Sequence, residues 1–283
     1  MDKYPVALIT GCSTGIGLET SLLLARQGYR VFATMRDLKK SSSLRQAAVG
    51  LSLEILQLDV DKPASVKKAV SAVLKKAGSI DVLINNAGWG AFGATEEFTD
   101  KEIHAQFETN LFGLLRVTRA VLPAMRDQKS GRIINVGSLA GKMTFAGIGL
   151  YCATKYAVEA VTESLRLEVR PFNIQVGLVE PGVIETRFKD NRRKAQTFFQ
   201  EKSAYQPVME KVFAWSNERA KGAPGPEKVA GTILKALRDR RMALRYALGF
   251  DAVWYPVAKW FMPSFVYELV MRRMYGRFLK EPA

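Results

Sequence analysis

A tyrosine and a lysine in the second half of the chain have the spacing needed for proton exchange during hydride transfer. Tyr151 and Lys155 are four residues apart in a segment with a helical pattern, so both side chains lie on one face. Ser138 follows an apolar run, where its hydroxyl could orient a substrate oxygen. Free tyrosine has a pKa of about 10, and a nearby ammonium group lowers it by stabilising the phenolate. We predict that Tyr151 exchanges the proton, with Lys155 and Ser138 assisting, although the Tyr–Lys pair alone is also a common surface contact.

A glycine-rich turn near the N-terminus is suited to binding a pyrophosphate. Residues 10–17 read T-G-C-S-T-G-I-G, between an apolar run at 6–9 and a helical pattern at 15–27. Glycines permit a tight turn and close approach of the backbone, and the start of the helix offers free N–H groups. The spacing differs from the usual G-x-G-x-x-G, so its place between strand and helix supports the prediction. The residues expected at the cofactor are Gly11, Ser13, Thr14, Gly15, Ile16 and Gly17.

The end of the second expected strand favours a phosphorylated cofactor. Sites for NAD carry an acidic residue roughly 20 residues after the glycines, where it binds the ribose 2′-hydroxyl. Here Arg36 stands at the tip, and Asp37 lies one residue further out. A guanidinium can bind a 2′-phosphate through two hydrogen bonds, and Ser13 could add another. We therefore predict NADP(H) as the cofactor.

The apolar pattern predicts an α/β fold of the Rossmann type, with a doubly wound parallel sheet. Continuous apolar strands alternating with helices are covered on both faces, and ligands bind at their carboxyl ends, where each motif above falls. The expected strands are 6–9, 31–34, 53–58, 82–84, 132–136 and 174–179, and the helices between them are 15–27, 64–76, 101–125 and 150–170.

The length of 283 residues allows a single domain with a terminal extension. We expect a dinucleotide-binding and catalytic domain over 1–250, with a helical substrate lid at about 188–225, and a helical, aromatic-rich extension over 251–283. The segment 252–271 is about one membrane span long, but it holds Lys259, Glu268 and two prolines. We expect two short amphipathic segments there, either packed on the domain or lying on a membrane surface.

The chain is strongly basic, with a net charge of +15. From Arg187 onward, 20 Lys and Arg residues outnumber nine Asp and Glu residues by 11. This charge indicates either a solvated surface, attraction to anionic membranes, or steering of an anionic cofactor or substrate. Since no nucleic-acid motif accompanies it, we expect no nucleic-acid partner.

Few side chains are suited to metal or nucleophilic chemistry. His104 is the only histidine, and Cys12 and Cys152 are the only cysteines, so we expect no metal site. A Ser-His-Asp hydrolase is disfavoured because His104 would be the only base and no G-x-S-x-G occurs. Both cysteines are expected to be reduced, and Cys152 to be a packing residue. With no secretory signal at the N-terminus, we expect a cytoplasmic protein, with peripheral membrane association left open.

Taken in order, these motifs resemble the short-chain dehydrogenase/reductase family in its classical form, over residues 6–187. The glycine turn is similar to the family's T-G-x-x-x-G-x-G, and residues 85–88 are its N-N-A-G. Asp59, beside Val60, resembles the aspartate that meets the adenine ring. The resemblance implies that N-N-A-G supports the sheet and lines the adenosine ribose, and that 181–186 bind the nicotinamide. It adds to the cofactor site Asp59, Val60, Asn86, Ala87, Gly88, Tyr151, Lys155, Pro181, Gly182, Val183 and Thr186.

The same resemblance completes a catalytic tetrad. Asn110 is similar to the family's asparagine, which the resemblance implies holds a water of the proton relay, and Ser138, Tyr151 and Lys155 match the other three members. It also implies that Lys155 binds the nicotinamide ribose. A homodimer is expected, with the helices at 101–125 and 150–170 packed against their symmetry mates.

Three stretches resemble the subgroup of 17β-hydroxysteroid and retinol dehydrogenases, namely T-G-C-S at 10–13, A-T-M-R-D at 33–37 and Y-C-A-T-K at 151–155. We therefore expect an NADP(H)-dependent oxidoreductase acting on a lipophilic alcohol or ketone, which is steroid-, retinoid- or acyl-like. Four aromatic residues after Arg187 either line an apolar pocket or form the core of a helical cap, namely Phe198, Phe199, Phe213 and Trp215.

Two alternatives remain open at this point. Within the enzyme class, the chain could be a 3-oxoacyl-thioester reductase, whose basic surface would meet an acidic carrier protein. From another class, it could be a non-catalytic NADP-binding sensor or scaffold. Against the second stand Asn110, Ser138, Tyr151 and Lys155, because a binding protein has no need of all four.

Overall fold

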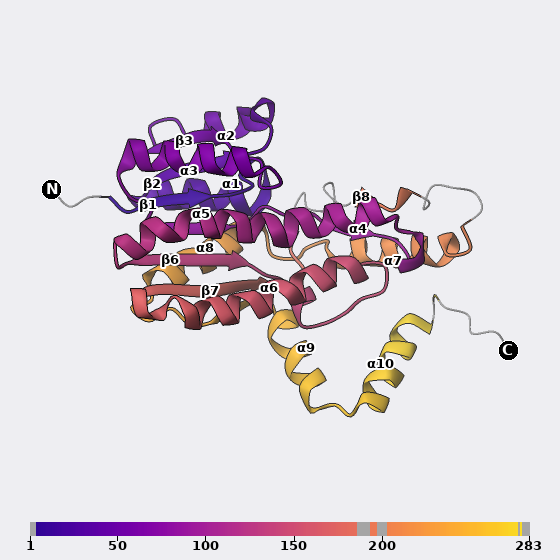
Figure 1. The fold of residues 1–283 in the computed structure, drawn as a ribbon. Coiled ribbons are helices and arrows are strands. Elements are labelled where there is room, and N and C mark those ends of the chain that lie inside the picture. The colour runs from indigo at the N-terminus through magenta and orange to yellow at the C-terminus, as the bar shows by residue number, and fades with distance from the viewer. Residues whose placement is uncertain (1–3, 186–192, 197–202, 277, 279–283) are drawn as a thin grey trace.

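A parallel sheet of seven strands forms the centre of the molecule, in a computed structural model that describes residues 4–185, 193–196, 203–276 and 278 (Figure 1). The strand order is β3-β2-β1-β4-β6-β7-β9, and every neighbouring pair is parallel. This order is that of a doubly wound sheet, which confirms the predicted Rossmann-type fold. The strands are β1 (Val6–Ile9), β2 (Arg30–Met35), β3 (Leu53–Gln57), β4 (Val82–Asn85), β6 (Gly131–Val136), β7 (Ile174–Pro181) and β9 (Arg245–Leu248).

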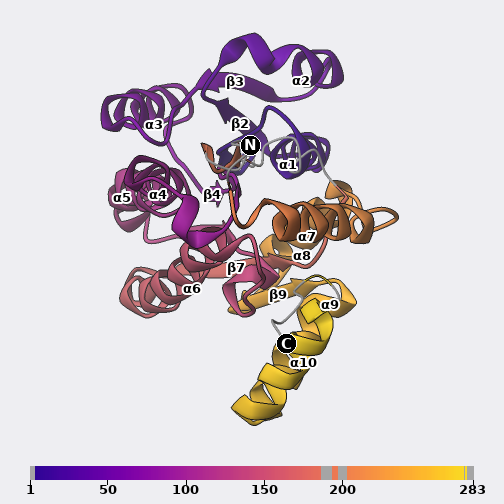
Figure 2. The same cartoon turned by 90° about the vertical axis from the view of Figure 1, so that its right-hand side faces the viewer.

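Helices cover both faces of this sheet, as continuous apolar strands require (Figure 2). One core lies between the sheet and α1 (Gly15–Arg26), α2 (Ser42–Ala47) and α8 (Pro226–Arg238). The opposite core is closed by α3 (Pro63–Ala77), α5 (Leu114–Asp127) and α6 (Gly149–Glu168). Several boundaries follow from local sequence: α3 begins with Pro63 in its first turn and ends at Gly78 with φ +79°.

The helical pattern at 101–125 contains an interruption that was not predicted. Helix α4 (Asp100–Phe107) begins with a capping box between Thr99 and Glu102. A π-helical turn over Glu108–Gly113 then joins it to α5. Such turns are frequent at functional sites, and this one contains Asn110. Strand β9 was also not predicted, because its four residues, R-Y-A-L, mix charged and apolar side chains.

Beyond the sheet, a small cap covers one end of the molecule. Strands β5 (Ala91–Phe92) and β8 (Arg193–Lys194) pair in parallel, and α7 (Gln206–Arg219) packs its Met209 and Val212 against Phe92. Part of the expected lid, at 188–192 and 197–202, lies outside the described residues.

The chain then forms a hairpin of two helices, α9 (Phe250–Phe261) and α10 (Ser264–Gly276), which projects from the body (Figure 1). These correspond to the two short segments expected after residue 251. Among the described residues, no helix has both the length and the apolar character needed to cross a membrane.

Candidate active site

A cavity of about 580 Å³ lies at the carboxyl ends of the parallel strands. It runs from the glycine turn to the residues after β6 and β7 and on to the aromatic side chains of the cap. Two predicted residues lie behind its wall, Gly17 and Asn110, and a third, Thr186, lies outside the described residues. The predicted residues that line it are Gly11, Ser13, Thr14, Gly15, Ile16, Arg36, Asp59, Val60, Asn86, Ala87, Gly88, Ser138, Tyr151, Lys155, Pro181, Gly182 and Val183.

The glycine turn is shaped by close backbone contacts. Gly11 and Gly15 have φ values of +73° and +60°, a region that favours glycine. A Cβ on Gly17 would lie 2.4 Å from the carbonyl oxygen of Gly11, so this glycine lets α1 pack directly under the turn. Asn86 Nδ2 braces the turn by donating to the carbonyl oxygens of Thr10 and Gly11 at 2.9 and 3.0 Å. The turn therefore presents the start of α1 to the cavity, as a pyrophosphate site requires.

Two cations line the cavity end beyond β2, Arg36 and Lys40. Asp37 is also there, but its Oδ1 accepts a hydrogen bond from the backbone N–H of Lys39 at 2.9 Å and caps a short 3₁₀ turn. The carboxylate is thus engaged by its own backbone. Lys40 was missed in the sequence, although its position one turn after Arg36 was visible. Arg36 and Lys40 thus bring two cationic side chains to this end of the cavity, which suits a phosphate.

Three predicted catalytic side chains meet in this cavity. Ser138 caps a 3₁₀ turn at the end of β6, where its Oγ accepts from the N–H of Ala140 at 3.1 Å. Lys155 Nζ donates to the carbonyl oxygen of Val136 at 2.7 Å and lies 5.8 Å from the ring centroid of Tyr151. Burial lowers the pKa of Lys155 to about 8, opposed by the negative charge of Glu159. The ammonium group of Lys155 therefore lies beside the phenol of Tyr151, and the hydroxyl of Ser138 lines the same cavity.

Asn110 has a different position from the other three members of the predicted tetrad. Its side chain is buried and binds the backbone of Trp89 on both sides, accepting from the N–H at 3.0 Å and donating to the carbonyl at 2.9 Å. Its Nδ2 also donates to Thr154 Oγ1 at 3.1 Å, and that hydroxyl donates to the carbonyl oxygen of Tyr151. The side chain of Asn110 therefore links the cavity wall at Trp89 to the turn of α6 that carries Tyr151.

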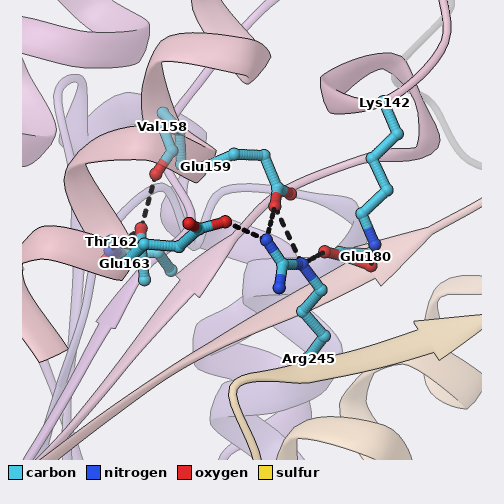
Figure 3. Close-up of polar contacts among 8 residues, drawn as sticks. Lys142, Val158, Glu159, Thr162, Glu163, Glu180 and Arg245 are labelled. Atoms are coloured by element: carbon cyan, nitrogen blue, oxygen red, sulfur yellow. Dashed lines mark hydrogen bonds and ion pairs between the residues drawn. The ribbon is translucent and has the colours of Figure 1, made fainter.

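An ionic cluster that was not predicted joins α6 to β7 and β9 (Figure 3). It consists of Glu159, Glu180, Lys142 and Arg245, and we call it the Glu159–Glu180 cluster. Lys142 Nζ lies 2.6 Å from Glu180 Oε2, while Arg245 Nε lies 3.2 Å from Glu159 Oε2 and 3.1 Å from Glu180 Oε1. Burial and the neighbouring Glu180 raise the pKa of Glu159 to about 8.

This cluster supports the loop that carries Ser138. A Cβ on Gly141 would lie 3.0 Å from Cγ of Glu159, and one on Gly137 would lie 3.4 Å from its Oε1, so both glycines leave room for this side chain. Glu159 follows Lys155 by one helical turn, and this spacing was the only feature of the sequence that could have placed Glu159 near the site. Glu180 and Arg245 come from β7 and β9, whose pairing only the fold reveals.

The far end of the cavity is apolar and comes from the cap and the hairpin. Trp215 lines it, whereas Phe213 packs against Phe92 with ring centroids 4.8 Å apart. Trp215 is therefore a pocket residue, and Phe213 belongs to the core of the cap. Phe198 and Phe199 lie outside the described residues. Further apolar lining comes from Phe145, Ile148, Val212, Tyr255 and Tyr275, which were not predicted.

Two arginines at this end were also missed. Arg193 lies over the ring of Trp89, 4.4 Å from its centroid, and Arg219 lies over Trp215 at 5.1 Å. Arg219 also donates to the hydroxyl of Tyr255 at 3.1 Å, so it connects α7 to α9 across the cavity. No sequence motif around Arg193 or Arg219 predicts that either residue lines the cavity.

The two cysteines take no part in this chemistry. Both are free and buried. Burial raises the pKa of Cys12 to about 12, and it raises the pKa of Cys152 as well. Neither thiol is therefore activated as a nucleophile.

Comparisons with known proteins agree with this geometry. A family model described as short chain dehydrogenase matches residues 5–197. The chain is 35% identical over 272 residues to 3-ketodihydrosphingosine reductase of Bacteroides thetaiotaomicron, covering 96% of this chain and 98% of that protein. It is 36% identical over 261 residues to retinol dehydrogenase 8 of Bos taurus, covering 86% and 81%. The crystal structure of a short-chain dehydrogenase from Streptomyces avermitilis superposes with a TM-score of 0.82 at 34% identity, covering 98% of each chain.

Proposed function

The chain belongs to the short-chain dehydrogenase family, and on that premise we propose that it interconverts an alcohol and its ketone or aldehyde on a lipophilic molecule, using NADP(H). The observation that carries the proposal is the convergence of Ser138, Tyr151 and Lys155 on the cavity that begins at the glycine turn. One continuous space thus joins a dinucleotide cradle to a proton donor. Enzymes of this family act on CH–OH groups, and the proposal concerns the cofactor, the residues and the substrate class.

The residues present fit a dinucleotide. The glycine turn, in which a side chain on Gly11 or Gly17 would clash with backbone, would hold the pyrophosphate. Arg36 and Lys40 would bind the 2′-phosphate. The adenosine would lie against Asp59, Val60 and 86–88, and the nicotinamide against 181–183. When bound, NADP(H) supplies or accepts the hydride.

The chain's own residues would manage the proton. In reduction, Ser138 Oγ donates a hydrogen bond to the substrate oxygen, and the hydroxyl of Tyr151 gives that oxygen its proton. In oxidation the phenolate of Tyr151 takes the proton from the hydroxyl group of the alcohol. The ammonium group of Lys155 stabilises the phenolate through its charge, at the distance that the carbonyl oxygen of Val136 sets. Asn110 acts here as a positioning residue, since its side chain fixes the backbone of Trp89.

NADP(H) is preferred over NAD(H) in this proposal. Arg36 and Lys40 stand where selective NAD sites carry a carboxylate, and Asp37 is occupied as a cap. A charge-assisted hydrogen bond to a phosphate is typically worth about 1.5–3 kcal/mol. That range corresponds to a preference of roughly ten- to a hundredfold.

The substrate class follows from the apolar end of the cavity. Its wall is formed by aromatic and aliphatic side chains, with Arg193 and Arg219 stacked on aromatic rings. Such a wall favours a long or ring-shaped hydrocarbon. Two relatives bear names that refer to a retinol and to a ketodihydrosphingosine. We infer a lipophilic alcohol or ketone of comparable character.

A turnover screen tests this function. Steroid, retinoid and long-chain ketones and alcohols would be offered with NADPH and NADP⁺, beside free and carrier-bound 3-oxoacyl thioesters. We expect turnover of a free lipophilic compound that is abolished in Tyr151→Phe. Preference for a carrier-bound thioester would overturn the proposal in favour of a 3-oxoacyl-thioester reductase. Tight NADPH binding without turnover of any substrate class would favour a non-catalytic NADP-binding sensor or scaffold.

We also propose a homodimer built on α5 and α6. The outer face of α6 presents a stripe of small and apolar exposed residues, Ala153, Ala160 and Leu167, at the spacing of one helix face. A two-fold axis beside such a face would pair α6 with its symmetry mate, and two-fold dimers are the commonest oligomers.

A further inference from the structure

The hairpin of α9 and α10 holds an unusual concentration of exposed apolar side chains. Of the 17 large apolar residues that are exposed among the described residues, nine lie between positions 250 and 270. They include both tryptophans of α9, of which Trp260 is 80% exposed. An apolar surface of this kind on a projecting element marks a site of contact. The nine are Phe250, Val253, Trp254, Val257, Trp260, Phe261, Phe265, Leu269 and Val270.

The hairpin is fixed to the body through its other face. Asp251 Oδ2 accepts from the N–H of Val183 in the proposed nicotinamide loop at 2.8 Å. Further along α9, Lys259 Nζ donates to the carbonyl oxygen of Lys142 at 2.9 Å. On α10, the hydroxyl of Tyr275 accepts from the N–H of Ala146 at 3.2 Å. Because these contacts orient both helices, the apolar face is a fixed outward surface.

We propose that this apolar face docks onto an anionic lipid bilayer and lies within one leaflet. Tryptophan and phenylalanine beside aliphatic side chains are typical of helices at the membrane interface. The helices have 12 and 13 residues, and no described helix can cross a membrane, so the hairpin lies along the surface. The tip between them, at 261–265, inserts furthest.

Charge favours an anionic bilayer as the partner of this face. The protein carries a net charge of +15, so an anionic lipid surface attracts it. On the hairpin, Asp251 is held by the backbone of Val183, and Glu268 pairs with Arg272 at 2.9 Å. Arg273 is exposed and has no acidic partner among the described residues. The docking face therefore presents no unpaired carboxylate to anionic lipid.

The position of this face relates it to the substrate. Tyr255 and Tyr275 line the cavity, while Trp254, the neighbour of Tyr255, is 55% exposed on the docking face. The two sides of the hairpin thus face the leaflet and the cavity. Resting on the proposed function, we infer that a lipophilic substrate enters the cavity from the leaflet.

Vesicle sedimentation of the full chain tests the docking. We expect binding to vesicles of phosphatidylcholine with phosphatidylserine, weaker binding to phosphatidylcholine alone, and a blue shift of the tryptophan fluorescence. The double variant Trp260→Ser/Phe261→Ser should lose at least tenfold in vesicle affinity, because it removes two exposed aromatic side chains next to the tip of the hairpin. As a matched control, Tyr4→Ser removes an aromatic ring that is 68% exposed elsewhere and should bind like the wild type.

The outcomes separate this inference from the proposed function. Docking is overturned if the wild type stays in solution with anionic vesicles, or if the double variant binds as well as the wild type. It is equally overturned if the double variant changes only the oligomeric state. NADPH binding and reduction of a water-soluble ketone should be unaffected in the double variant, while turnover of a vesicle-borne ketone falls. Equal turnover of the vesicle-borne ketone by both proteins would overturn the inference that the substrate enters from the leaflet, without affecting the docking proposal.

Discussion

The ammonium nitrogen of Lys155 donates a hydrogen bond to the main-chain carbonyl oxygen of Val136 at 2.7 Å. This contact ties α6 to the end of β6, the strand that leads into Ser138. It fixes the cation at one place beside Tyr151, where the lysine is only 8% exposed. The strength of that charge, and with it the proposed proton transfer, therefore depends on burial as well as on sequence.

Removal of one hydroxyl tests the proposed acid. In Tyr151→Phe we expect kcat to fall by about 10²–10⁴-fold, since positioned proton transfer contributes about that much. NADPH affinity and thermal stability should stay close to those of the wild type, because the ring is retained. Steady-state kinetics and fluorescence titration measure both. Near-normal turnover with cofactor bound would contradict the mechanism.

The burial of Lys155 predicts a pH dependence of cofactor binding. Burial lowers the pKa of its ammonium group to about 8 in the free protein. An anionic cofactor favours the charged form, so NADPH affinity should be full below this pKa and decline as the pH rises through it. Titrations across this range should show the decline in the wild type. Lys155→Ala should bind NADPH more weakly and without that pH dependence; an unchanged profile in the variant would assign the effect to another group.

Cofactor preference should depend on Arg36. We expect Arg36→Ala to lower kcat/KM with NADPH by roughly ten- to a hundredfold, which corresponds to the loss of about 1.5–3 kcal/mol, and to leave kcat/KM with NADH nearly unchanged. Lys40→Ala should act in the same direction. Arg45→Ala, at a cation outside the cavity, serves as the control. A wild type that uses both cofactors equally would refute the assignment.

The Glu159–Glu180 cluster should make the protein less stable as the pH rises from mildly acidic values to about 8. The pKa of Glu159 is raised from 4.5 to about 8, so its protonated form stabilises the fold at low pH, and that contribution is lost as the pH rises through about 8. Lys142, Glu163, Glu180 and Arg245 are the charged groups that face it.

Glu159→Gln keeps the shape of the side chain but cannot ionise. Its free energy of unfolding should therefore change less between mildly acidic and alkaline pH than that of the wild type. Urea denaturation at several pH values measures this difference. Parallel curves for the two proteins would contradict the raised pKa of Glu159.

The dimer proposal predicts that a bulky cation on α6 separates the subunits. Ala160 is exposed on the stripe proposed for the two-fold contact, so Ala160→Arg should give monomers in sedimentation velocity. Lys75→Arg on α3, outside that stripe, should keep the state of the wild type. A wild type that sediments as a monomer would contradict the proposed dimer.

Much of the fold and of the cofactor site could be predicted from the sequence. Strand ends, glycines and the Tyr–Lys spacing are local features, and the rule that parallel strands share one carboxyl edge brings them together. Gly11, Ser138 and Lys155 accordingly line one cavity. The helix at 101–125 and the two segments after 251 also follow from local periodicity, although the π-helical turn around Asn110 does not.

What only the tertiary structure decided are the contacts between segments far apart in the chain. Asn110 reaches the backbone of Trp89, and Glu180 and Arg245 meet because β9 pairs with β7. No periodicity encodes such pairings, since they depend on how whole elements pack. The orientation of the hairpin also depends on contacts between distant segments. Its apolar residues can be read from the sequence, but the contacts of Asp251 and Lys259 with the body determine that these residues face outward.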